Sequence, residues 1–375
     1  MRVAVFGASG YTGAELVRWL LRHPNVQIAA ATSRQEAGKR LEDVFPGLRG
    51  QTDLAFSDPD AALTELASPG ALDFAFLALP AGASFAYAPR LLDAGVRVID
   101  LGADFRLRDP DAYRRWYGLP HGAPHLLTEA VYGLADLHGA QIAGARLVAN
   151  PGCYPTAVAL ALAPLLRRGL AHVGAGDDAG EPVIIHALSG VSGAGASPRP
   201  EYQFALLQGN FWPYKVGSHR HTPEMEQELS ALAGGSAQVK VLFVPNLVPA
   251  VRGILATCYV RPAPAPGPAR RPAAAGIPPD APLDTQVLLA LYAEFYGGHP
   301  AIQVLPEPAL PQAKAVAGTP NCHLAVRFDP HSGYIVAMAA LDNLAKGAAT
   351  QAIQNMNLMA GFPPLTGLEA TAQWP

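Results

Sequence analysis

The chain has 375 residues, half of them hydrophobic, and a formal net charge of −3, so we expect two domains with well-filled cores. This charge does not suggest a surface for nucleic acid or for an anionic membrane. The sequence shows no apolar run of 18 residues, and its three scattered cysteines lack disulfide or metal-ligand spacing. We also expect no signal peptide. We therefore expect a cytoplasmic protein without a metal site.

The first 150 residues alternate short apolar runs with helical patterns, which predicts a parallel sheet with helices on both faces. The expected strands cover residues 3–6, 27–31, 74–79, 97–101 and 147–149. The expected helices cover residues 14–22, 60–66 and 84–94.

Longer strand patterns begin near residue 183 and predict a mixed sheet. These strands are expected at residues 183–188, 238–244, 254–260, 323–328 and 334–340. The segment 343–359 has a helical pattern, and we expect it to return to the first domain. The predicted domains are therefore 1–152 completed by 341–375, and 153–340. Segment 171–182 is predicted to be a Gly-rich loop, and 261–279 a mobile Pro/Ala-rich insertion.

Three glycines in the sequence GASGYTG separate the first strand from the first helix. Glycines at such a junction let the backbone approach a pyrophosphate, and the following helix supplies free N–H groups. The alternative is an ordinary tight turn. We predict a dinucleotide site formed by Gly7, Ser9, Gly10, Tyr11, Thr12 and Gly13.

The second strand indicates which dinucleotide is bound. It ends in Ala-Thr-Ser33-Arg34 and lacks the acid that holds the ribose of NAD. Ser33 and Arg34 instead suit a 2′-phosphate, which favours NADP, although Arg34 as a solvated loop cation is the alternative. Pro80, after the third strand, completes the predicted cofactor-binding residues.

A cysteine stands at a predicted helix start, in the sequence NPGCYPT at 150–156. Pro155 suits a first helical turn, so Cys153 is expected at the helix N-terminus. The helix dipole there favours a reactive thiolate, and sulfur forms a thioester that is a good acyl donor. We predict that Cys153 is the nucleophile, whereas Cys258 and Cys322 are expected to be small buried hydrophobes.

The segment HRHTPE at 219–224 precedes another predicted helix, for which Thr222 is the expected N-cap. Two histidines around an arginine predict a proton-transfer group with an anion clamp, and structural histidines are the alternative. We favour His219 as the acid/base, keep His221 as the other candidate, and expect Glu224 to orient one ring.

Several cations could hold a carboxylate or phosphate of the substrate, although each could instead be a solvated surface charge. The predicted substrate-binding residues are Arg106, Asn150, Lys215, Arg220 and Arg252.

At these residues the chain resembles the N-acetyl-gamma-glutamyl-phosphate reductase family of arginine biosynthesis, nearly from end to end. The matching segments are GASGYTGAEL at 7–16, DLGADFRL at 100–107, VYGL at 131–134, NPGCYPT at 150–156, SGVSGAG at 189–195, NFWPYKVGSHRHTPE at 210–224 and DNLAKGAATQAIQNMNLM at 342–359. The resemblance implies a Rossmann-type domain plus an α/β substrate domain of the aspartate-semialdehyde and glyceraldehyde-phosphate dehydrogenase type. It also implies cytoplasmic homotetramers or homodimers.

The resemblance further implies the reaction. The expected activity is the NADPH-dependent reductive dephosphorylation of N-acetyl-glutamyl 5-phosphate to N-acetyl-glutamate 5-semialdehyde, through a thioester on the cysteine. Two alternatives are the same chemistry on an aspartyl or amino-adipyl phosphate, and a non-catalytic protein that senses NADP.

Overall fold

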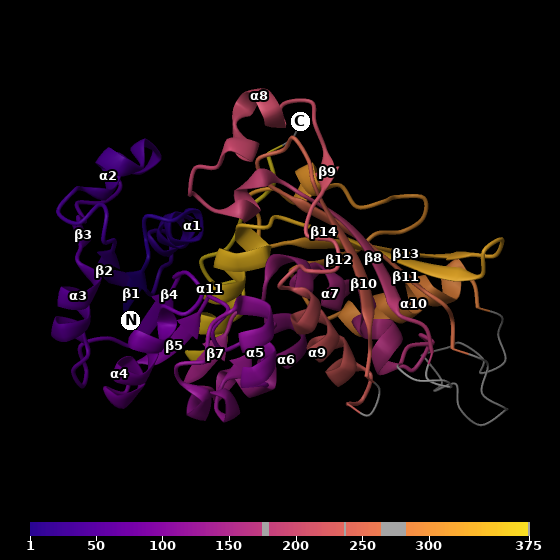
Figure 1. Ribbon diagram of the computed structural model, residues 1–375, viewed down its shortest axis with the longest axis horizontal. Helices are drawn as coiled ribbons and strands as arrows, with labels where there is room; N and C mark the ends of the chain where they lie inside the picture. The colour runs from indigo at the N-terminus through magenta and orange to yellow at the C-terminus, as the bar shows by residue number, and fades with distance from the viewer. Residues whose placement is uncertain (175–179, 236–237, 264–282, 374–375) are drawn as a thin grey trace. The chain divides into compact units, whose positions relative to one another are not determined.

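The computed structural model describes all residues except 175–179, 236–237, 264–282 and 374–375 (Figure 1). The chain divides into two compact units. The first comprises Met1–Gly152, Ala194–Pro198 and Leu344–Ala370, and the second comprises the described residues of Cys153–Gly193, Arg199–Asn343 and Thr371–Pro375. Most of the predicted insertion 261–279 lies outside the described residues, as does the middle of the predicted loop 171–182.

The first unit contains a seven-stranded sheet of order β3-β2-β1-β4-β5-β7-β6, and every strand pair in it is parallel. The strands are β1 Arg2–Phe6, β2 Gln27–Thr32, β3 Phe56–Ser57, β4 Phe74–Leu77, β5 Arg97–Asp100, β6 Val131–Tyr132 and β7 Leu147–Ala149. They are short and almost wholly apolar, because a parallel sheet is buried on both faces. The predicted parallel sheet is confirmed.

Side chains that point to opposite faces of this sheet belong to two separate apolar cores. Val3 and Val5 of β1 belong to one core, together with Trp19 of the first helix and Met356 of the last. Phe6 of β1 belongs to the other core, which includes residues of the helices α3 (Pro59–Leu66) and α4 (Ala88–Asp93). The last helix therefore packs on the first sheet, although it lies more than 340 residues from β1 in sequence.

The helices of the first unit differ from the prediction in their boundaries. They are α1 Tyr11–Leu20, α2 Leu41–Val44, α3 Pro59–Leu66, α4 Ala88–Asp93, α5 Pro110–Tyr117, α6 Ala135–Ala143 and α11 Thr350–Met359. The continuous helix predicted at 84–94 is wrong: a 3₁₀ turn Ser84–Ala86 precedes α4. Pro89 lacks an N–H, and its ring would clash with the carbonyl of Phe85, so one helix cannot span both. The helix predicted at 343–359 begins instead as a π-helix, Ala345–Ala349.

The strand order places a reversal between β1 and β4. The chain runs outward from β1 through β2 to β3, then returns to the other side of β1 as β4 and continues to β5. In open parallel sheets ligands bind at the carboxyl ends of the strands at such a reversal. The loops that follow β1 and β4 therefore mark the expected binding edge of this unit.

The second unit contains a mixed sheet of order β12-β13-β14-β11-β8-β10-β9. Its strands are β8 Val183–Ser189, β9 Trp212–Pro213, β10 Val241–Leu247, β11 Ile254–Val260, β12 Ile302–Val304, β13 Cys322–Asp329 and β14 Tyr334–Leu341. Among the described strands of this second sheet, only the pairs β10–β8 and β12–β13 are parallel. The predicted mixed sheet is confirmed, while the short edge strands β9 and β12 were not predicted.

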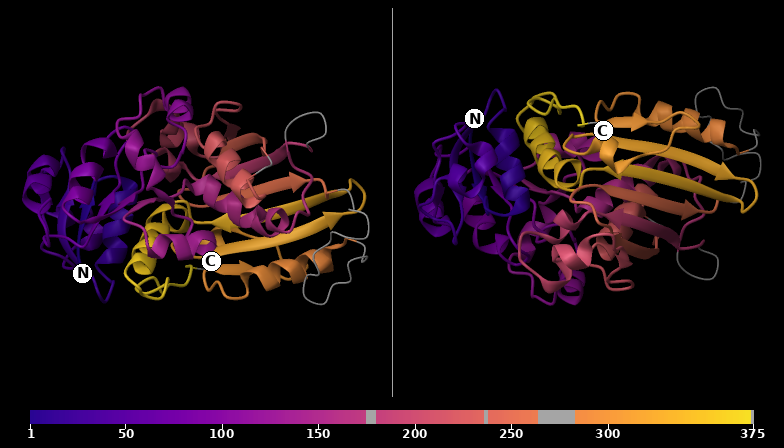
Figure 2. Two further views of the ribbon diagram at one scale, coloured as in Figure 1. Left: turned by 90° about the horizontal axis from the view of Figure 1, so that it is seen from below. Right: turned by 90° about the horizontal axis from the view of Figure 1, so that it is seen from above.

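Three helices pack against this sheet, α7 Cys153–Arg167, α9 Thr222–Leu232 and α10 Thr285–Tyr296. Buried and partly buried residues alternate along the strands. In β11, for example, Ile254 and Cys258 are buried, whereas Thr257 is only partly buried. Figure 2 shows the sheet from its helix-covered side (left) and from its more open side (right). The short helix α8 Phe204–Leu207 lies in the long connection before β9. Among the described residues, no helix is long and apolar enough to cross a membrane.

Candidate active site

The turn after β1 needs glycine at two of its three glycine positions. Gly7 has φ +82°, and a Cβ there would lie 2.3 Å from the carbonyl oxygen of Ala78. A Cβ on Gly13 would lie 2.3 Å from the carbonyl oxygen of Gly7, whereas at Gly10 the nearest such atom is 3.6 Å away. The first glycine thus allows close packing against the segment after β4, the third allows it within the turn, and at the second a Cβ would make only an ordinary van der Waals contact.

Helix α1 begins at Tyr11, and its N-cap Gly10 provides no side-chain cap. The N–H groups of the first turn, which contains Thr12 and Gly13, can therefore donate to an external acceptor. Such a helix start after a glycine turn suits a pyrophosphate, because it combines N–H donors with the positive end of the helix dipole. The local structure fits the predicted dinucleotide.

The end of β2 is joined to this turn by hydrogen bonds. The Gly7 N–H donates to Thr32 Oγ1 (3.3 Å), and the hydroxyls of Ser9 and Ser33 lie 2.8 Å apart. Arg34 makes contacts that the sequence did not reveal: it donates to both carboxylate oxygens of Asp60 (2.9 and 3.1 Å) and to the Tyr87 hydroxyl (3.0 Å).

Arg34 and Asp60 remain largely exposed, with 63% and 62% of their side chains accessible. The hydrogen bond to Asp60 raises the pKa of Arg34, and the same bond lowers the pKa of Asp60. A 2′-phosphate at this position would therefore compete with Asp60 for the guanidinium group. Because an exposed ion pair is only weakly stabilising, such an exchange is feasible.

Pro80 is exposed in the loop that follows β4. Its carbonyl accepts the N–H of Ala83 (3.1 Å), and Gly82 in the same loop has φ +89°. The loop begins beside the glycine turn, because Ala78 and Leu79 are the residues that a Cβ on Gly7 would meet. Pro80 thus lies on the β1–β4 binding edge.

Cys153 is the first residue of α7 and is partly exposed, whereas the next thirteen residues are buried. This position places the sulfur at the positive end of the helix dipole, which stabilises a thiolate. Pro155 stands in the first turn of the helix, as predicted. Cys258 is fully buried, and burial raises the pKa of its thiol to about 12.

Two tyrosines adjoin the cysteine, and the sequence analysis did not single them out. The hydroxyls of Tyr154 and Tyr214 are 3.0 Å apart. Burial raises the pKa of both hydroxyls, and negative charge on Cys153 adds to the effect on both. Tyr154 directly follows the cysteine, but its pairing with a residue 60 positions away leaves no sequence signal.

The same tyrosines bring the two predicted histidines together. The ring of Tyr154 lies edge-on to His219 (5.6 Å between centroids) and to His221 (6.0 Å). The two imidazoles are 4.9 Å apart, and Tyr214 lies 5.5 Å from His219. The second unit thus groups Tyr154, the residue after Cys153, with both histidines.

His219 is held in one tautomer by a local hydrogen bond. Its Nδ1 accepts the backbone N–H of His221 (3.1 Å), so the neutral ring carries its proton on Nε2. Burial, together with positive charge on His221, Lys215 and Arg220, lowers the pKa of His219 to about 2. The ring is therefore neutral near pH 7 and can act as an Nε2–H donor.

His221 occupies the N-cap of α9, and its carbonyl accepts the N–H of Met225 (2.9 Å). The predicted N-cap, Thr222, is wrong, because this bond makes Thr222 the first helical residue and places Pro223 second. Pro223 lacks the N–H that a first-turn residue would leave unbonded, so this position suits it. Glu224 is fully buried in the first turn.

Three of the predicted substrate cations lie in the second unit. Lys215 has φ +48° in a tight turn, and burial together with the charges of Arg220 and Arg199 lowers its pKa. Arg252 is partly exposed, with Nη1 3.4 Å from Asp342 Oδ2. Lys215 and Arg220 also act on His219, so this side of the unit offers positive charge beside the histidines.

Arg106 and Asn150 lie in the first unit, where both make structural contacts. Arg106 donates through Nε to the carbonyl of Asn150 (2.8 Å) and through Nη2 to the carbonyl of Leu101 (2.9 Å). The Asn150 amide donates to Ala348 O (3.2 Å) and accepts from Asn355 Nδ2 (3.1 Å). These contacts fix Asn150, which follows the end of β7 and stands three residues before Cys153 in the sequence.

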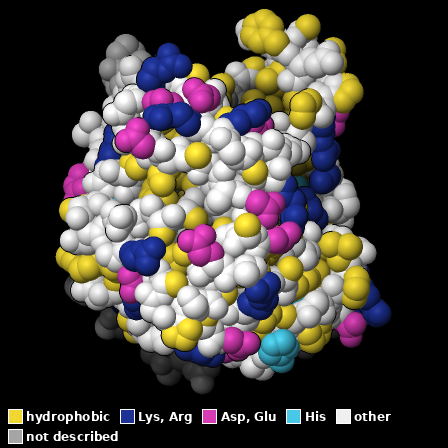
Figure 3. All heavy atoms as spheres, turned by 90° about the vertical axis from the view of Figure 1, so that its left-hand side faces the viewer, with side chains coloured by type: hydrophobic (Ala, Val, Ile, Leu, Met, Phe, Trp, Pro, Cys, Tyr) yellow, Lys and Arg dark blue, Asp and Glu magenta, His cyan; other side chains and the backbone are white. Residues whose placement is uncertain are grey.

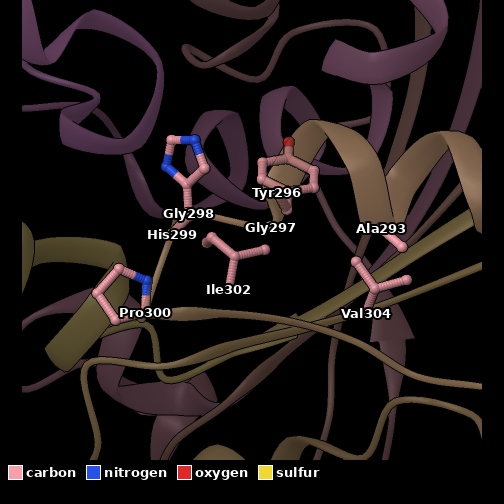
Figure 4. Close-up of a pocket in the computed structure, with 8 residues that line it drawn as sticks. All are labelled: Ala293, Tyr296, Gly297, Gly298, His299, Pro300, Ile302 and Val304. Atoms are coloured by element: carbon pink, nitrogen blue, oxygen red, sulfur yellow. The ribbon is translucent and has the colours of Figure 1, made fainter. Parts of the chain in front are cut away.

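One surface pocket of about 450 Å³ lies apart from the predicted residues (Figure 4). Its walls come from the end of α10, the following loop and β12. The lining residues are Ala293, Tyr296, Gly297, Gly298, His299, Pro300, Ile302 and Val304. None of the predicted site residues lines this pocket.

On the face drawn in Figure 3, basic and acidic side chains of the described residues are interspersed, as the small net charge leads us to expect.

Two family models match the chain. The semialdehyde dehydrogenase NAD binding domain matches residues 2–145, and the semialdehyde dehydrogenase dimerisation domain matches residues 153–343. Among solved structures, the chain is similar to aspartate semialdehyde dehydrogenase II of Vibrio cholerae, solved in complex with ASA (TM-score 0.69, 18% identity, 96% of this chain and 98% of that one). Aspartate semialdehyde dehydrogenase of Candida albicans, solved with NADP, has a TM-score of 0.62 at 18% identity, again covering 96% and 98%. These likenesses confirm the predicted fold class.

Curated relatives match along the whole chain. An N-acetyl-gamma-glutamyl-phosphate reductase of Desulforudis audaxviator is 46% identical over 375 residues, covering all of both chains. One of Symbiobacterium thermophilum is 46% identical over 372 residues, covering 98% of this chain and 97% of that one. With such identity over such length, the chain belongs to the N-acetyl-gamma-glutamyl-phosphate reductase family.

Proposed function

We propose that this chain catalyses the NADPH-dependent reductive dephosphorylation of N-acetyl-glutamyl 5-phosphate in arginine biosynthesis. The products are N-acetyl-glutamate 5-semialdehyde, phosphate and NADP. One observation carries the proposal: Cys153 begins α7, and its neighbour Tyr154 lies against both histidines of the HRH segment. A helix-start thiol beside histidines and cations suits acyl transfer from an anionic acyl phosphate.

The first chemical step belongs to Cys153. Its thiolate attacks the acyl carbon, a C–S bond forms, and the bond from that carbon to the phosphate oxygen breaks. Phosphate departs with both bonding electrons and leaves a thioester. A serine hydroxyl is far less ionised than a thiol, which explains why this chemistry uses sulfur.

Residues of the first unit would hold the coenzyme. The N–H groups at the start of α1 would bind the pyrophosphate, between the turn of Gly7 and Gly13 and the side chain of Ser9. Ser33 and Arg34 would bind the 2′-phosphate. To do so, Arg34 would give up its ion pair with Asp60. Pro80 would border the same edge. NADPH, when bound there, supplies the hydride that reduces the thioester carbon.

His219 would act on the oxygen of the reacting carbonyl. Its Nε2–H would donate to the oxyanion of the tetrahedral thiohemiacetal, which later collapses to release the aldehyde and the thiolate. A neutral donor serves here, because collapse expels sulfur as an anion and needs no proton on the carbonyl oxygen. His221 supports the ring by donating its backbone N–H to Nδ1.

The remaining predicted residues divide by their contacts. Lys215, Arg220 and Arg252 would hold the carboxylate and phosphate of the substrate, because they add positive charge in the second unit. Arg106 and Asn150 would support the end of β7, and any contact of theirs with the substrate remains a prediction.

The two units suggest a division of labour. Residues 1–152 with 341–375 would bind the coenzyme, and 153–340 would carry catalysis and assembly, in a cytoplasmic homodimer or homotetramer. The more open face of the second sheet supports the assembly, since partly buried residues such as Thr257 and Met338, which pair across β11 and β14, point to this face while their neighbours along each strand are buried on the other. Sedimentation of a Met338→Asp variant tests this: dissociation supports the sheet face as the interface, and an unchanged oligomer excludes it.

The substrate is tested by assaying the reverse reaction with a panel of aldehydes. Purified protein is given NADP, phosphate and one semialdehyde, derived from N-acetyl-glutamate, aspartate or amino-adipate. We expect NADP reduction with the N-acetyl-glutamate compound, dependent on phosphate. Preference for another aldehyde would indicate a different acyl phosphate, and no reaction with any would favour a sensor protein.

A further inference from the structure

Two buried acids, Asp100 and Asp104, lie at the end of β5 and four residues beyond it in the first unit. Asp104 is fully buried, and its carboxylate accepts three hydrogen bonds. Its Oδ1 accepts from the Gly82 N–H (2.7 Å) and the Tyr113 hydroxyl (2.7 Å), and its Oδ2 accepts from the Ser84 N–H (2.9 Å). Three donors make this environment suited to a negative charge.

Asp100, the last residue of β5, is equally buried but less well supplied with donors. Its Oδ1 accepts from the Ser84 hydroxyl (2.7 Å) and the Gly102 N–H (3.1 Å). Its Oδ2 has no hydrogen-bond partner among the described residues. A buried carboxylate oxygen without a donor disfavours the ionised form.

Burial and the nearest carboxylate also disfavour the ionised form of Asp100. Burial and the neighbouring Asp104 raise the pKa of Asp100 to about 7, while Ser84, Arg106 and Gly102 oppose the rise. Tyr113 of α5 also lies near, and its phenol is neutral because burial and Asp104 raise its pKa. His121 faces the backbone of Asp104, with Nε2 2.6 Å from the carbonyl oxygen.

Both acids hold the same short loop, residues 80–84. Asp104 binds the N–H groups of Gly82 and Ser84, and Asp100 binds the Ser84 hydroxyl. This loop follows β4 and begins against the glycine turn, where a Cβ on Gly7 would lie 3.2 Å from Leu79 Cδ2. The acids therefore support one wall of the binding edge at the β1–β4 reversal.

We propose that Asp100 is a positioning residue of the coenzyme site. In its protonated form it lets Ser84 and Asp104 hold the 80–84 loop. Ionisation of Asp100 loosens that loop and weakens dinucleotide binding. The inference rests on the proposed NADPH site. Ionisation places a second negative charge beside Asp104 in a fully buried region, where like charges repel strongly. The Ser84 contact to both acids is the link through which this repulsion reaches the loop.

The test measures the dissociation constant of NADPH for the full-length protein between pH 6 and 8.5, by coenzyme fluorescence. We expect the constant of the wild type to rise roughly five- to tenfold across this range, a coupling of ordinary size. Asp100→Asn keeps an oxygen acceptor but cannot ionise, so its constant should stay low and nearly flat. Because the coenzyme phosphate itself titrates near pH 6, the difference between these two curves is the quantity that decides.

A second variant keeps the idea testable if Asp100→Asn does not fold. Ser84→Ala removes only the side-chain link to Asp100, so it should bind NADPH weakly at every pH. Asp58→Asn, at the exposed N-cap of α3, is the matched acid-to-amide control and should follow the wild type. The role of Asp100 is overturned if the dissociation constant of the wild type changes with pH in parallel with that of Asp100→Asn or of Ser84→Ala. Loss of NADPH binding by the wild type at all pH values would instead refute the coenzyme site itself.

Discussion

His219 is surrounded by aromatic rings and positive charge, and these surroundings determine how the ring can act. Its Nδ1 is engaged by a backbone N–H, and its pKa is lowered to about 2. The sequence suggested His219 as an acid/base, a role in which an ordinary histidine changes charge near pH 6.5. The structure favours instead a permanently neutral donor, which orients and stabilises an oxyanion without forming an imidazolium.

This protonation state predicts a particular pH dependence. Because a ring with a pKa near 2 is already neutral above about pH 4, His219 should add no limb to the rate profile between pH 5 and 9. His219→Asn should lower kcat by roughly 10²–10⁴-fold without changing the shape of that profile. Steady-state rates of the wild type and the variant over this pH range provide the measurement.

His221→Asn is the matched variant for this experiment, since it keeps the backbone N–H that holds His219. It should lower kcat less than His219→Asn does. The assignment of the two rings is inverted if His221→Asn proves the more damaging. A profile limb near pH 6.5 that disappears in His219→Asn would show that His219 does become charged.

At the scale of elements, the contact between Arg34, which follows β2, and Asp60 of α3 would determine how a 2′-phosphate is bound. Arg34→Ala should raise the KM for NADPH roughly tenfold or more, because a charge-assisted contact is lost, while the KM for NADH stays nearly constant. Asp60→Asn should have the opposite effect and lower the KM for NADPH, because it removes the competing carboxylate. Equal losses with both coenzymes in Arg34→Ala would contradict a contact with the 2′-phosphate.

The glycine turn makes a second prediction at this scale. Gly13→Ala would place its Cβ 2.3 Å from the Gly7 carbonyl oxygen, so the turn must deform and both the melting temperature and NADPH binding should fall. Gly10→Ala meets no such backbone atom and should change the melting temperature little. Thermal melting with and without NADPH measures both effects. Similar melting temperatures for the two variants would show that the turn can accommodate a Cβ at either position.

Element types were more predictable than their ends or their partners. The apolar runs predicted the central parallel strands and the mixed sheet, because burial on two faces or one leaves a clear pattern. Helix starts were less secure: α1 begins at Tyr11, three residues earlier than predicted, and α9 uses His221 as its N-cap. The two-residue strand β9 has too few positions for a period to show.

At the scale of the whole molecule, the features of the candidate site that depend on neighbouring residues in the sequence were predictable. The features that depend on contacts between residues far apart in the sequence were not. Cys153 at a helix start follows from NPGCYPT alone, and the structure agrees with that placement. Two other contacts depend on tertiary packing, so no sequence pattern predicts them. They are the hydroxyl pair of Tyr154 and Tyr214 and the contact of Arg34 with Asp60. The same holds for the loop that Asp100 and Asp104 support.

The central claim, a thioester on Cys153, is tested most directly by mass spectrometry of the full-length enzyme. The protein is mixed with N-acetyl-glutamyl 5-phosphate without NADPH, quenched in acid and digested. We predict one N-acetyl-glutamyl group on the peptide that contains Cys153, lost with aldehyde release when NADPH is added before the quench. Cys153→Ser should carry no acyl group and show almost no turnover, whereas Cys258→Ser should behave as the wild type. An active wild-type enzyme that never carries the acyl group, or that carries it on another residue, would contradict the account.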